Sequence, residues 1–354
     1  MNRYQPWLGG ALVAALGLYC IGMDTLLTQR SADIAAMPAA QAQIAEGYPV
    51  VVRQYNSRKE QEDFVYNNPP RRVVAVWQNS IETLIALGEG EQIIAAIGIP
   101  DKKYLREEYQ DTYTRIDYQS DRVPDLETAL MMHPDFILGW YSTFGPKALR
   151  GSDFWRARGI NTYIAESSIP TGASTKKHTL DEEYRYLEDM GRIFGKRELA
   201  HRMVQGVQDH IAAVRAYAAE RDTRPKALVI EWMGKEIRVY GESTLAGQMV
   251  QSVDGELLAA DLDRIGEEEM RVLDPDVIFL VVTETLYGSE QMLIERLIHH
   301  PALKNMRCVK EGRIHTLLLN AVYSPGVRVQ DGVELIAAAL YPDMRTELSE
   351  RGHE

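Results

Sequence analysis

The chain contains two copies of one local pattern, a helix candidate that ends at Pro-Asp and passes directly into an apolar strand candidate. The copies are Glu127–Leu138 (ETALMMHPDFIL) and Glu268–Phe279 (EEMRVLDPDVIF), and in each the glutamate precedes the proline by seven positions. Proline cannot continue a helix, so a helix that stops at Pro-Asp is a common entry to a strand. The equal spacing of the glutamate in two distant segments favours a duplicated α/β architecture over two unrelated junctions of this common kind.

Apolar runs alternate with helical patterns after residue 68, which is typical of βα units around a mainly parallel sheet. The strand candidates of the first half are 73–77, 93–97, 136–140 and 162–165. The same plan restarts at 227–232, where Arg-Pro-Lys precedes the strand much as Pro-Arg-Arg precedes 73–77. We therefore predict two Rossmann-like α/β lobes with mainly parallel sheets, at residues 69–178 and 224–354.

The segment between the lobes, residues 179–223, is polar and strongly helical. Apolar side chains recur at helix spacing on both sides of Gly195. At about 1.5 Å per residue, a helix from Arg197 to Arg221 would be roughly 36 Å long, the width of a small domain. We predict that the two lobes are joined by a long, rigid α-helix that holds them at a nearly constant separation.

The N-terminus has the composition of an export signal. Arg3 is the only charged residue before the apolar run Trp7–Met23, which Asp24 ends. The run is longer than a signal-peptide core of about 7–15 residues and shorter than most membrane spans of about 20. We predict a signal peptide or membrane anchor at residues 1–23 and a tether and lead-in at 24–68.

The fate of this segment stays open at the sequence level. Cys20 stands where the cysteine of a lipoprotein would stand, but Gly17-Leu18-Tyr19 matches the usual small-residue pattern poorly. Cleavage, lipidation at Cys20 and retention as an anchor are the three alternatives. In each case we expect an extracytoplasmic protein, in the periplasm or at the cell surface, that is membrane-tethered unless it is cleaved.

Composition and motifs exclude several other functions. The 39 basic and 51 acidic residues give a net charge of −12, which argues against a general nucleic-acid binder. The two cysteines, Cys20 and Cys308, exclude a disulfide scaffold and a four-cysteine metal site. The chain lacks the Gly-rich phosphate loop, the His-Glu-x-x-His motif and the Gly-x-Ser-x-Gly motif of common enzymes. We predict no catalytic residue, no metal site and no cofactor; a two-lobed metallocluster enzyme or chelatase remains the less favoured alternative.

Short segments from about residue 69 to residue 343 carry a family resemblance. They are Pro70–Val74, Ile81–Gly88, Pro124–Glu127, His133–Asp135, Leu187–Leu199, Gly241–Gly247, Glu268, Asp274–Asp276, His300–Leu303, Ser324–Arg328 and Leu340–Pro342. In their order and spacing they resemble the helical-backbone class of substrate-binding proteins of ABC importers, the group that captures ferric siderophores, haem and cobalamin. The resemblance implies two α/β lobes, a ligand cleft between them, and docking onto a membrane permease.

The resemblance also implies a role for two glutamates. In the family, one glutamate on each lobe meets arginines of the permease dimer, and Glu127 and Glu268 occupy those motif positions. The alternative is that both are ordinary solvated acids on a helix face. Two separated carboxylates on a rigid body can engage two basic pockets, although each exposed pair alone would contribute little.

Ligands of open α/β sheets lie at the carboxyl ends of the strands, so we expect the ligand-binding residues in the segments that follow each strand candidate. The candidate ligand-binding residues there are Trp77, Gln78, Trp140, Tyr141, Trp232, Tyr240, Tyr287, Tyr323 and Arg328. Their aromatic faces suit a large, flat or chelated ligand, and Arg328 would favour an anionic chelate. Packing between the lobes is the alternative for each tryptophan.

These observations predict a monomeric receptor for a metal chelate. We expect extracytoplasmic capture of a ferric siderophore-type chelate and its delivery to the permease dimer of an ABC importer, with no bond made or broken by the chain. A corrinoid (cobalamin) or haem carrier of the same class is the alternative. Adjacent His299 and His300 are not expected to bind metal, because neighbouring side chains on a helix point about 100° apart.

Overall fold

The structure is a computed structural model that describes residues 45–170, 177–234 and 236–344. The chain from Gly47 onward forms one compact unit. Within the described ranges, no helix combines the length and the apolar character needed to cross a bilayer. The predicted signal or anchor at residues 1–23, with Cys20, lies outside the described residues.

The first lobe is built on a parallel sheet. Among the described residues it has five strands in the order β5-β4-β3-β6-β7, every neighbouring pair parallel. The strands are β3 (Val73–Val76), β4 (Ile93–Ile97), β5 (Tyr118–Ser120), β6 (Phe136–Gly139) and β7 (Asn161–Ile164). All four residues of β3 are buried, as expected for a central strand that is covered on both faces.

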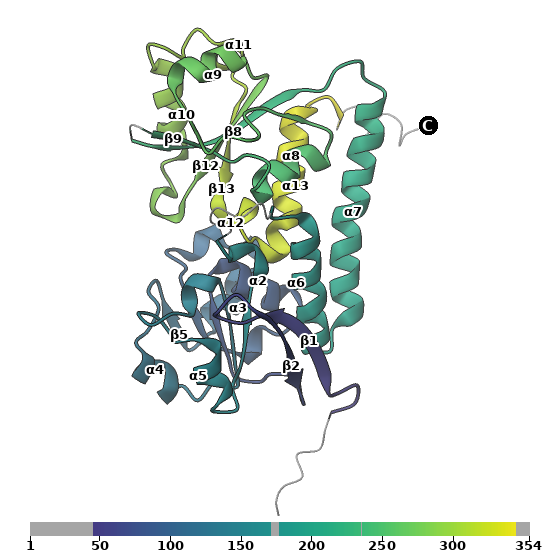
Figure 1. Cartoon of the computed structure of the whole chain (residues 1–354), viewed down its shortest axis with the longest axis vertical. Coiled ribbons are helices and arrows are strands. Elements are labelled where there is room, and N and C mark those ends of the chain that lie inside the picture. Colours follow the sequence, from purple (N-terminus) through teal and green to yellow (C-terminus); the bar gives the residue numbers. More distant parts are fainter. Residues whose placement is uncertain (1–44, 171–176, 235, 345–354) are drawn as a thin grey trace, which may run out of the picture. The chain divides into compact units, whose positions relative to one another are not determined.

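Helices cover this sheet and follow its strands (Figure 1). They are α2 (Gln78–Ala86), α3 (Glu107–Thr114), α4 (Leu126–Met131) and α5 (Ser152–Arg156). The alternation of strands and helices that the sequence predicted is therefore confirmed in this lobe.

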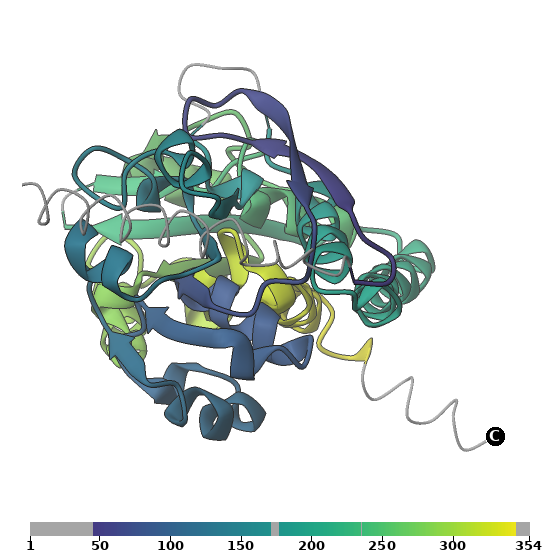
Figure 2. The ribbon, with the colours of Figure 1, turned by 90° about the horizontal axis from the view of Figure 1, so that it is seen from below.

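An antiparallel hairpin precedes the first lobe, where the sequence analysis placed only a lead-in. It consists of β1 (Val50–Tyr55) and β2 (Gln61–Tyr66). Val50 and Val52 are buried while Val51 between them is exposed, so the strand has the period of two that one-sided burial requires. The sequence does not show this period, because the outward-facing Val51 is apolar like its buried neighbours. Figure 2 shows the hairpin, in purple, beside the helix that begins the interlobe segment.

The interlobe segment contains two helices rather than one. They are α6 (Leu180–Ile193) and α7 (Arg197–Ala219), with Gly195 between them at a φ of 69° that favours glycine. Helix α6 packs against β1 and α7, whereas α7 also packs against α13 (Val329–Leu340) of the second lobe. With 23 residues, α7 is about 34 Å long and is the predicted rigid connection (Figure 1).

The second lobe has a mixed sheet of six strands within the described part of the chain. The path is β11-β9-β8-β12-β13, and β10 pairs with β8. The strands are β8 (Lys226–Met233), β9 (Glu236–Val239), β10 (Glu256–Leu257), β11 (Arg264–Ile265), β12 (Val277–Val282) and β13 (Ile314–Leu318). Strands β10, β12 and β13 extend the sheet in parallel, but β9 is antiparallel to β8 because a tight turn at Gly234 joins them.

Six further helices belong to this half of the described chain. Five of them are α8 (Leu245–Ser252), α9 (Glu267–Leu273), α10 (Glu290–His299), α11 (Arg307–Lys310) and α13 (Val329–Leu340). The short α12 (Leu319–Val322) and a 3₁₀ turn at Gly326–Arg328 lead from β13 into α13. This late segment packs against α2 and α6 of the first half, so it forms a second contact between the lobes in addition to α7.

The two Pro-Asp motifs have equivalent structural roles. His133 and Asp274, the residues before the prolines, both have left-handed backbone, with φ of 48° and 42°. Asp135 accepts hydrogen bonds from the backbone N–H groups of Arg71 (2.8 Å) and Arg72 (2.9 Å). Asp276 accepts one from Lys226 (2.7 Å). Each aspartate thus holds the chain that enters the central strand of its lobe, which confirms that one α/β plan is used twice.

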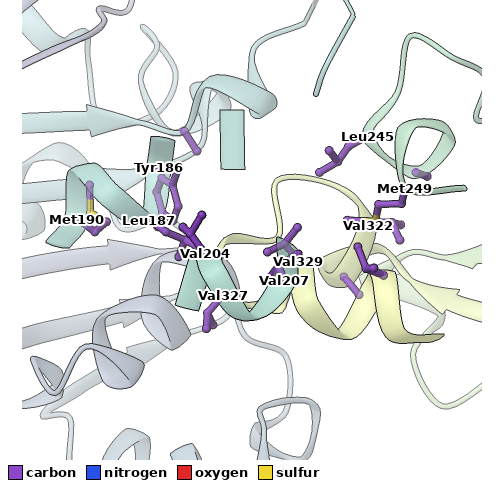
Figure 3. Packing of buried hydrophobic residues seen from close by; sticks show 14 of the residues in the cluster. Tyr186, Leu187, Met190, Val204, Val207, Leu245, Met249, Val322, Val327 and Val329 are labelled. Carbon is purple, nitrogen blue, oxygen red and sulfur yellow. The ribbon is translucent and has the colours of Figure 1, made fainter. Parts of the chain in front are cut away.

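Three apolar clusters fill the described part of the chain. One lies on the outer face of each sheet. The third is continuous from the first lobe through α6, α7, α8 and α13 into the second lobe (Figure 3). Its labelled members are Tyr186, Leu187, Met190, Val204, Val207, Leu245, Met249, Val322, Val327 and Val329. Because the lobes share this core, a large change in their relative position would expose apolar surface.

Candidate ligand-binding site

Trp77 and Trp140 follow neighbouring strands, β3 and β6, and their rings stack. The ring centroids are 5.0 Å apart and the ring planes differ by 21°. Trp77 has φ 72° and ψ 156°, a backbone region that costs about 1–3 kcal/mol for a residue with a side chain. Its ring covers Gly98, where a Cβ would approach the ring to 2.6 Å. Packing around Trp77 therefore holds a strained residue at a strand end, which is typical of a functional site.

Tyr323 brings the late segment of the chain to this aromatic pair. Its ring meets Trp140 edge-on, with centroids 5.2 Å apart and planes at 80°. Its hydroxyl donates to the backbone oxygen of Ser168 at 3.4 Å. The Nε1 group of Trp140 is buried and has no hydrogen-bond partner among the described residues. Three predicted residues, from positions far apart in the sequence, are therefore in contact.

The second lobe adds two tyrosines and two carboxylates. Tyr240 donates its hydroxyl to Glu231 Oε2 at 2.9 Å, and burial raises the pKa of Tyr240. The ring centroid of Tyr287 lies 4.4 Å from that of Tyr104 in the first lobe, so the two lobes are in contact at this point. Burial raises the pKa of Glu284, and the negative charge of Glu231 raises it further. These groups make the second-lobe side rich in hydrogen-bond acceptors.

One cation lies close to these acceptors. The guanidinium of Arg238 stands 4.9 Å from the centre of the Tyr240 ring and 3.8 Å from Glu231 Oε2. Its side chain is about half exposed, so solvent screens this pair. Arg238 therefore neutralises part of the local negative charge without burying it.

Arg328, the predicted partner of an anionic ligand, already has protein partners. It forms a two-point pair with Glu82, Nε to Oε2 at 2.7 Å and Nη2 to Oε1 at 2.9 Å. Its other amino group donates to Asp331 at 2.8 Å, and Nη2 also donates to the backbone oxygen of Tyr104. Four of the five N–H groups of a guanidinium are thus occupied. The structure places Arg328 in a junction between the halves of the chain rather than at an open surface.

Gln78 belongs to the same junction, and it leads to a residue that the sequence analysis missed. Its amide nitrogen donates to the backbone oxygen of Tyr104 at 2.7 Å, so its Oε1 must face Asn320, whose Nδ2 donates to it at 2.7 Å. This orientation leaves Asn320 Oδ1 as a buried acceptor with no partner in the described ranges. Asn320 is only 3% exposed, and its backbone N–H faces the hydroxyl of Tyr287.

Trp232 and Tyr141 lie apart from these contacts. The indole of Trp232 packs with Arg296 (4.6 Å) and His300 (5.3 Å) and donates to the backbone oxygen of Gly234. Side chains alternate along a strand, so Trp232 faces the outer cluster while its neighbour Glu231 faces inward. We expected the three tryptophans to face one groove. In the structure Trp77 and Trp140 are in contact, whereas Trp232 lies in the outer cluster of the second lobe.

Tyr141 begins the turn that follows Trp140. Its ring lies under the ammonium group of Lys59, 5.2 Å away, and it packs on the outer cluster of the first lobe. The cation covers the face of this ring, so Tyr141 offers less aromatic surface than its neighbour Trp140.

The predicted docking glutamates are both exposed. Glu127 lies in α4 and Glu268 in α9, the two helices that precede the Pro-Asp motifs. The side chain of Glu268 is 73% exposed, and it pairs with Arg271 one turn later at 2.8 Å. Their positions match the repeat.

A buried carboxylate secures the late segment to α6. Glu183 accepts hydrogen bonds from the backbone N–H of Gly326 (2.8 Å) and from the hydroxyl of Ser167. Burial raises the pKa of Glu183 to about 7, and the charge of Glu182 adds to this rise, while the two hydrogen bonds oppose it.

Glu183→Gln should change how stability depends on pH. The raised pKa means that the folded state loses stability as pH rises from about 4.5, the ordinary value, through about 7. A glutamine keeps an acceptor for Gly326 but does not ionise. We expect the variant to gain about 3 kcal/mol relative to wild type between pH 4.5 and pH 8, measured by urea unfolding. A constant difference across this range would contradict the burial of an ionising group.

Comparisons with known proteins agree with this architecture. The family described as "Periplasmic binding protein" matches residues 73–318, from the start of β3 to the end of β13. A crystal structure of a periplasmic binding protein from Veillonella parvula DSM 2008 is 41% identical; the match covers 84% of this chain and 93% of that one, with a TM-score of 0.80.

More distant relatives share the fold or part of the sequence. The structure of an ABC-type Fe³⁺-hydroxamate transport system from Saccharomonospora viridis DSM 43017 is 20% identical, covering 82% of this chain and 99% of that one, with a TM-score of 0.66. A ferric-anguibactin-binding protein from Vibrio anguillarum is 22% identical over 71% of this chain and 75% of its own length. Two α/β lobes, a long connecting helix and a family match across both sheets lead to one conclusion: the chain belongs to the periplasmic binding protein family and is a transport receptor, not an enzyme.

Proposed function

We propose that the chain captures a ferric siderophore-type chelate outside the cytoplasm and delivers it to the permease dimer of an ABC importer. The observation that carries this proposal is the stack of Trp77 on Trp140 at the carboxyl ends of β3 and β6, with Tyr323 edge-on to Trp140. Aromatic faces of this kind supply the area that a bulky chelate needs. Relatives named for ferric anguibactin and for iron uptake support an iron complex.

A corrinoid or haem is the second candidate. A periplasmic haem-binding protein from Roseiflexus sp. RS-1 and a vitamin B12-binding protein from Vibrio cholerae have the same fold, with TM-scores of 0.59 and 0.55. Their sequence identities of 20% and 18% support the fold alone.

The polar groups of the site favour a ligand that brings hydrogen-bond donors or positive charge. Arg328 is paired with Glu82, so the argument for an anionic chelate loses its basis. Glu231, Glu284 and the unpartnered oxygen of Asn320 are all acceptors. An anionic ligand beside two carboxylates would be repelled, whereas a cationic or amide-rich chelate would be attracted.

Quenching of tryptophan fluorescence tests this proposal. A cationic ferric hydroxamate should quench the purified chain at lower concentration than an anionic ferric catecholate, haemin or cobalamin. Trp77→Phe and Trp140→Phe should each reduce the quenching, because these rings would lie against the ligand. Trp232→Phe is the matched control and should retain it, since that indole faces the outer cluster. Strong quenching by haemin or cobalamin alone would favour the second candidate.

The place of the protein at the membrane is part of the proposal. We propose export through residues 1–23 and tethering by that segment or by a lipid on Cys20. A relative from Bacillus subtilis, 19% identical over 85% of this chain and 88% of its own length, is described as an ABC transporter substrate-binding lipoprotein. Fractionation of cells that express the full chain or its Cys20→Ser variant distinguishes the two tethers, because only a lipid anchor depends on the cysteine.

A further inference from the structure

Two residues have the most exposed large apolar side chains among the described residues. Val272 is 82% exposed and Met131 is 72% exposed, while the next large apolar residue, Met292, is 58% exposed. Single exposed apolar residues are common on proteins and need no explanation by themselves. What singles out these two is their position in the repeat.

Met131 and Val272 occupy equivalent places in the two lobes. Each lies four residues after a candidate docking glutamate, Glu127 or Glu268, and three residues before the proline of Pro-Asp. Residues four apart on a helix lie on the same face, one turn from each other. Helices α4 and α9 therefore each present a carboxylate and an apolar side chain on one exposed face.

The core does not need these two side chains. Ala129 and Met270, each two positions after the glutamate, are fully buried at 0% exposure and pack α4 and α9 onto their sheets. In Figure 1, α4 lies in the lower lobe and α9 in the upper lobe, both on the side away from α7. Each lobe thus has one helix with a buried residue two positions after the glutamate and an exposed apolar residue four positions after it.

We propose that Met131 and Val272 are contact residues of a two-point docking surface for a membrane partner with two equivalent subunits. The partner would offer, on each subunit, a basic side chain for the glutamate and an apolar recess for the neighbouring Met or Val. The inference rests on the proposed delivery to a permease dimer. It adds an apolar contact to the charged contact that each glutamate would make.

Charge favours a protein partner over lipid. Glu267, Glu268 and Glu269 open α9, and Glu127 lies in the first turn of α4. Anionic headgroups would repel these carboxylates, so the apolar side chains between them are poorly suited to enter a bilayer. In a protein interface the carboxylates would govern orientation and the association rate, and the buried apolar side chains would slow dissociation.

Site-specific crosslinking in cells tests the two-point geometry. A photoreactive amino acid replaces Met131, Val272, or both, in the full chain, and Met292 on α10 is the exposed apolar control position. Both single positions should crosslink the same integral membrane protein, and the doubly substituted chain should crosslink two copies of it. Crosslinks to different proteins, to lipid, from only one position, or no stronger than at Met292 would overturn the proposal.

Truncation measures the contribution of each side chain. Met131→Ala and Val272→Ala should each weaken binding to that membrane protein in proteoliposomes about tenfold, mainly through faster dissociation. Met292→Ala should not. Chelate quenching should be unchanged in all three, because α4 and α9 carry none of the candidate ligand residues. Unchanged docking with intact quenching would refute this inference alone, whereas absence of quenching in the wild-type chain would refute the proposed function.

Discussion

Replacing Arg328 by alanine should lower the free energy of unfolding by about 3–5 kcal/mol. Glu82 is completely buried, and Arg328 is the cation that pairs with both of its oxygens. Removing the guanidinium would leave an uncompensated carboxylate inside the protein, which is the costly way to break a buried ion pair. Urea unfolding at neutral pH measures the loss. Arg53→Ala, at an exposed pair with Asp63, is the matched control and should change stability by less than about 1 kcal/mol.

A second variant separates the charge from the volume of Arg328. Arg328→Met combined with Glu82→Gln removes both charges and keeps most of the packing. Replacement of a buried ion pair by neutral groups is often close to neutral for stability. The double variant should therefore recover much of the loss, since the glutamine can still accept from the backbone N–H of Arg106, now 2.7 Å from Glu82 Oε1. A loss below about 1 kcal/mol in Arg328→Ala would show that Glu82 does not depend on its partner.

The fold was predictable because its signals are local. The alternation of strands and helices, the 3.6-residue period of 197–219 and the two Pro-Asp motifs each fall within a short window of sequence. The hairpin β1–β2 was missed because the outward positions Val51 and Val65 are apolar, which conceals the alternation. The antiparallel direction of β9 was not predicted, since direction depends on the short turn at Gly234.

The candidate site was predictable only in part. Trp77 and Trp140 could be paired because parallel strands bring their carboxyl ends to one edge. The ion pair of Arg328 with Glu82 could not be predicted, because Glu82 lies 246 positions earlier and forms no sequence motif with Arg328. Trp232 faces outward with Leu228 and Ile230, but the alternate positions of β8 also include apolar residues. Its face is therefore decided by packing and not by pattern.

The shared core and the Glu82–Arg328 pair both resist large movement of the lobes. The apolar cluster crosses from one lobe to the other, and the ion pair joins α2 to the late segment beside α13. Loss of one of these contacts would still leave the other in place between the lobes. A body of this kind keeps two distant surface points at a constant separation, which is what simultaneous contact with two subunits requires.

The Glu127→Ala and Glu268→Ala double variant should leave chelate affinity unchanged and reduce uptake at least about tenfold. An exposed ion pair contributes at most about 1 kcal/mol, so each single variant should lose only about fivefold or less. Two contacts on one rigid body act together, because the first makes the second intramolecular. The reduction in uptake in the double variant should therefore exceed the reduction in either single variant. Uptake of the chelate that the purified chain binds is measured in cells whose only copy of the gene carries the changes.

Glu107→Ala with Glu295→Ala is the matched control for this experiment, since it also removes one exposed carboxylate from a helix of each half. The control makes the net charge less negative by the same amount, so it separates a specific docking role from a general effect of charge on encounter. Full uptake by the Glu127/Glu268 variant, or an equal loss in the control, would contradict docking through these two residues. Increasing salt should slow association of the wild-type chain more than that of the docking variant, because the variant lacks two of the charges that salt screens.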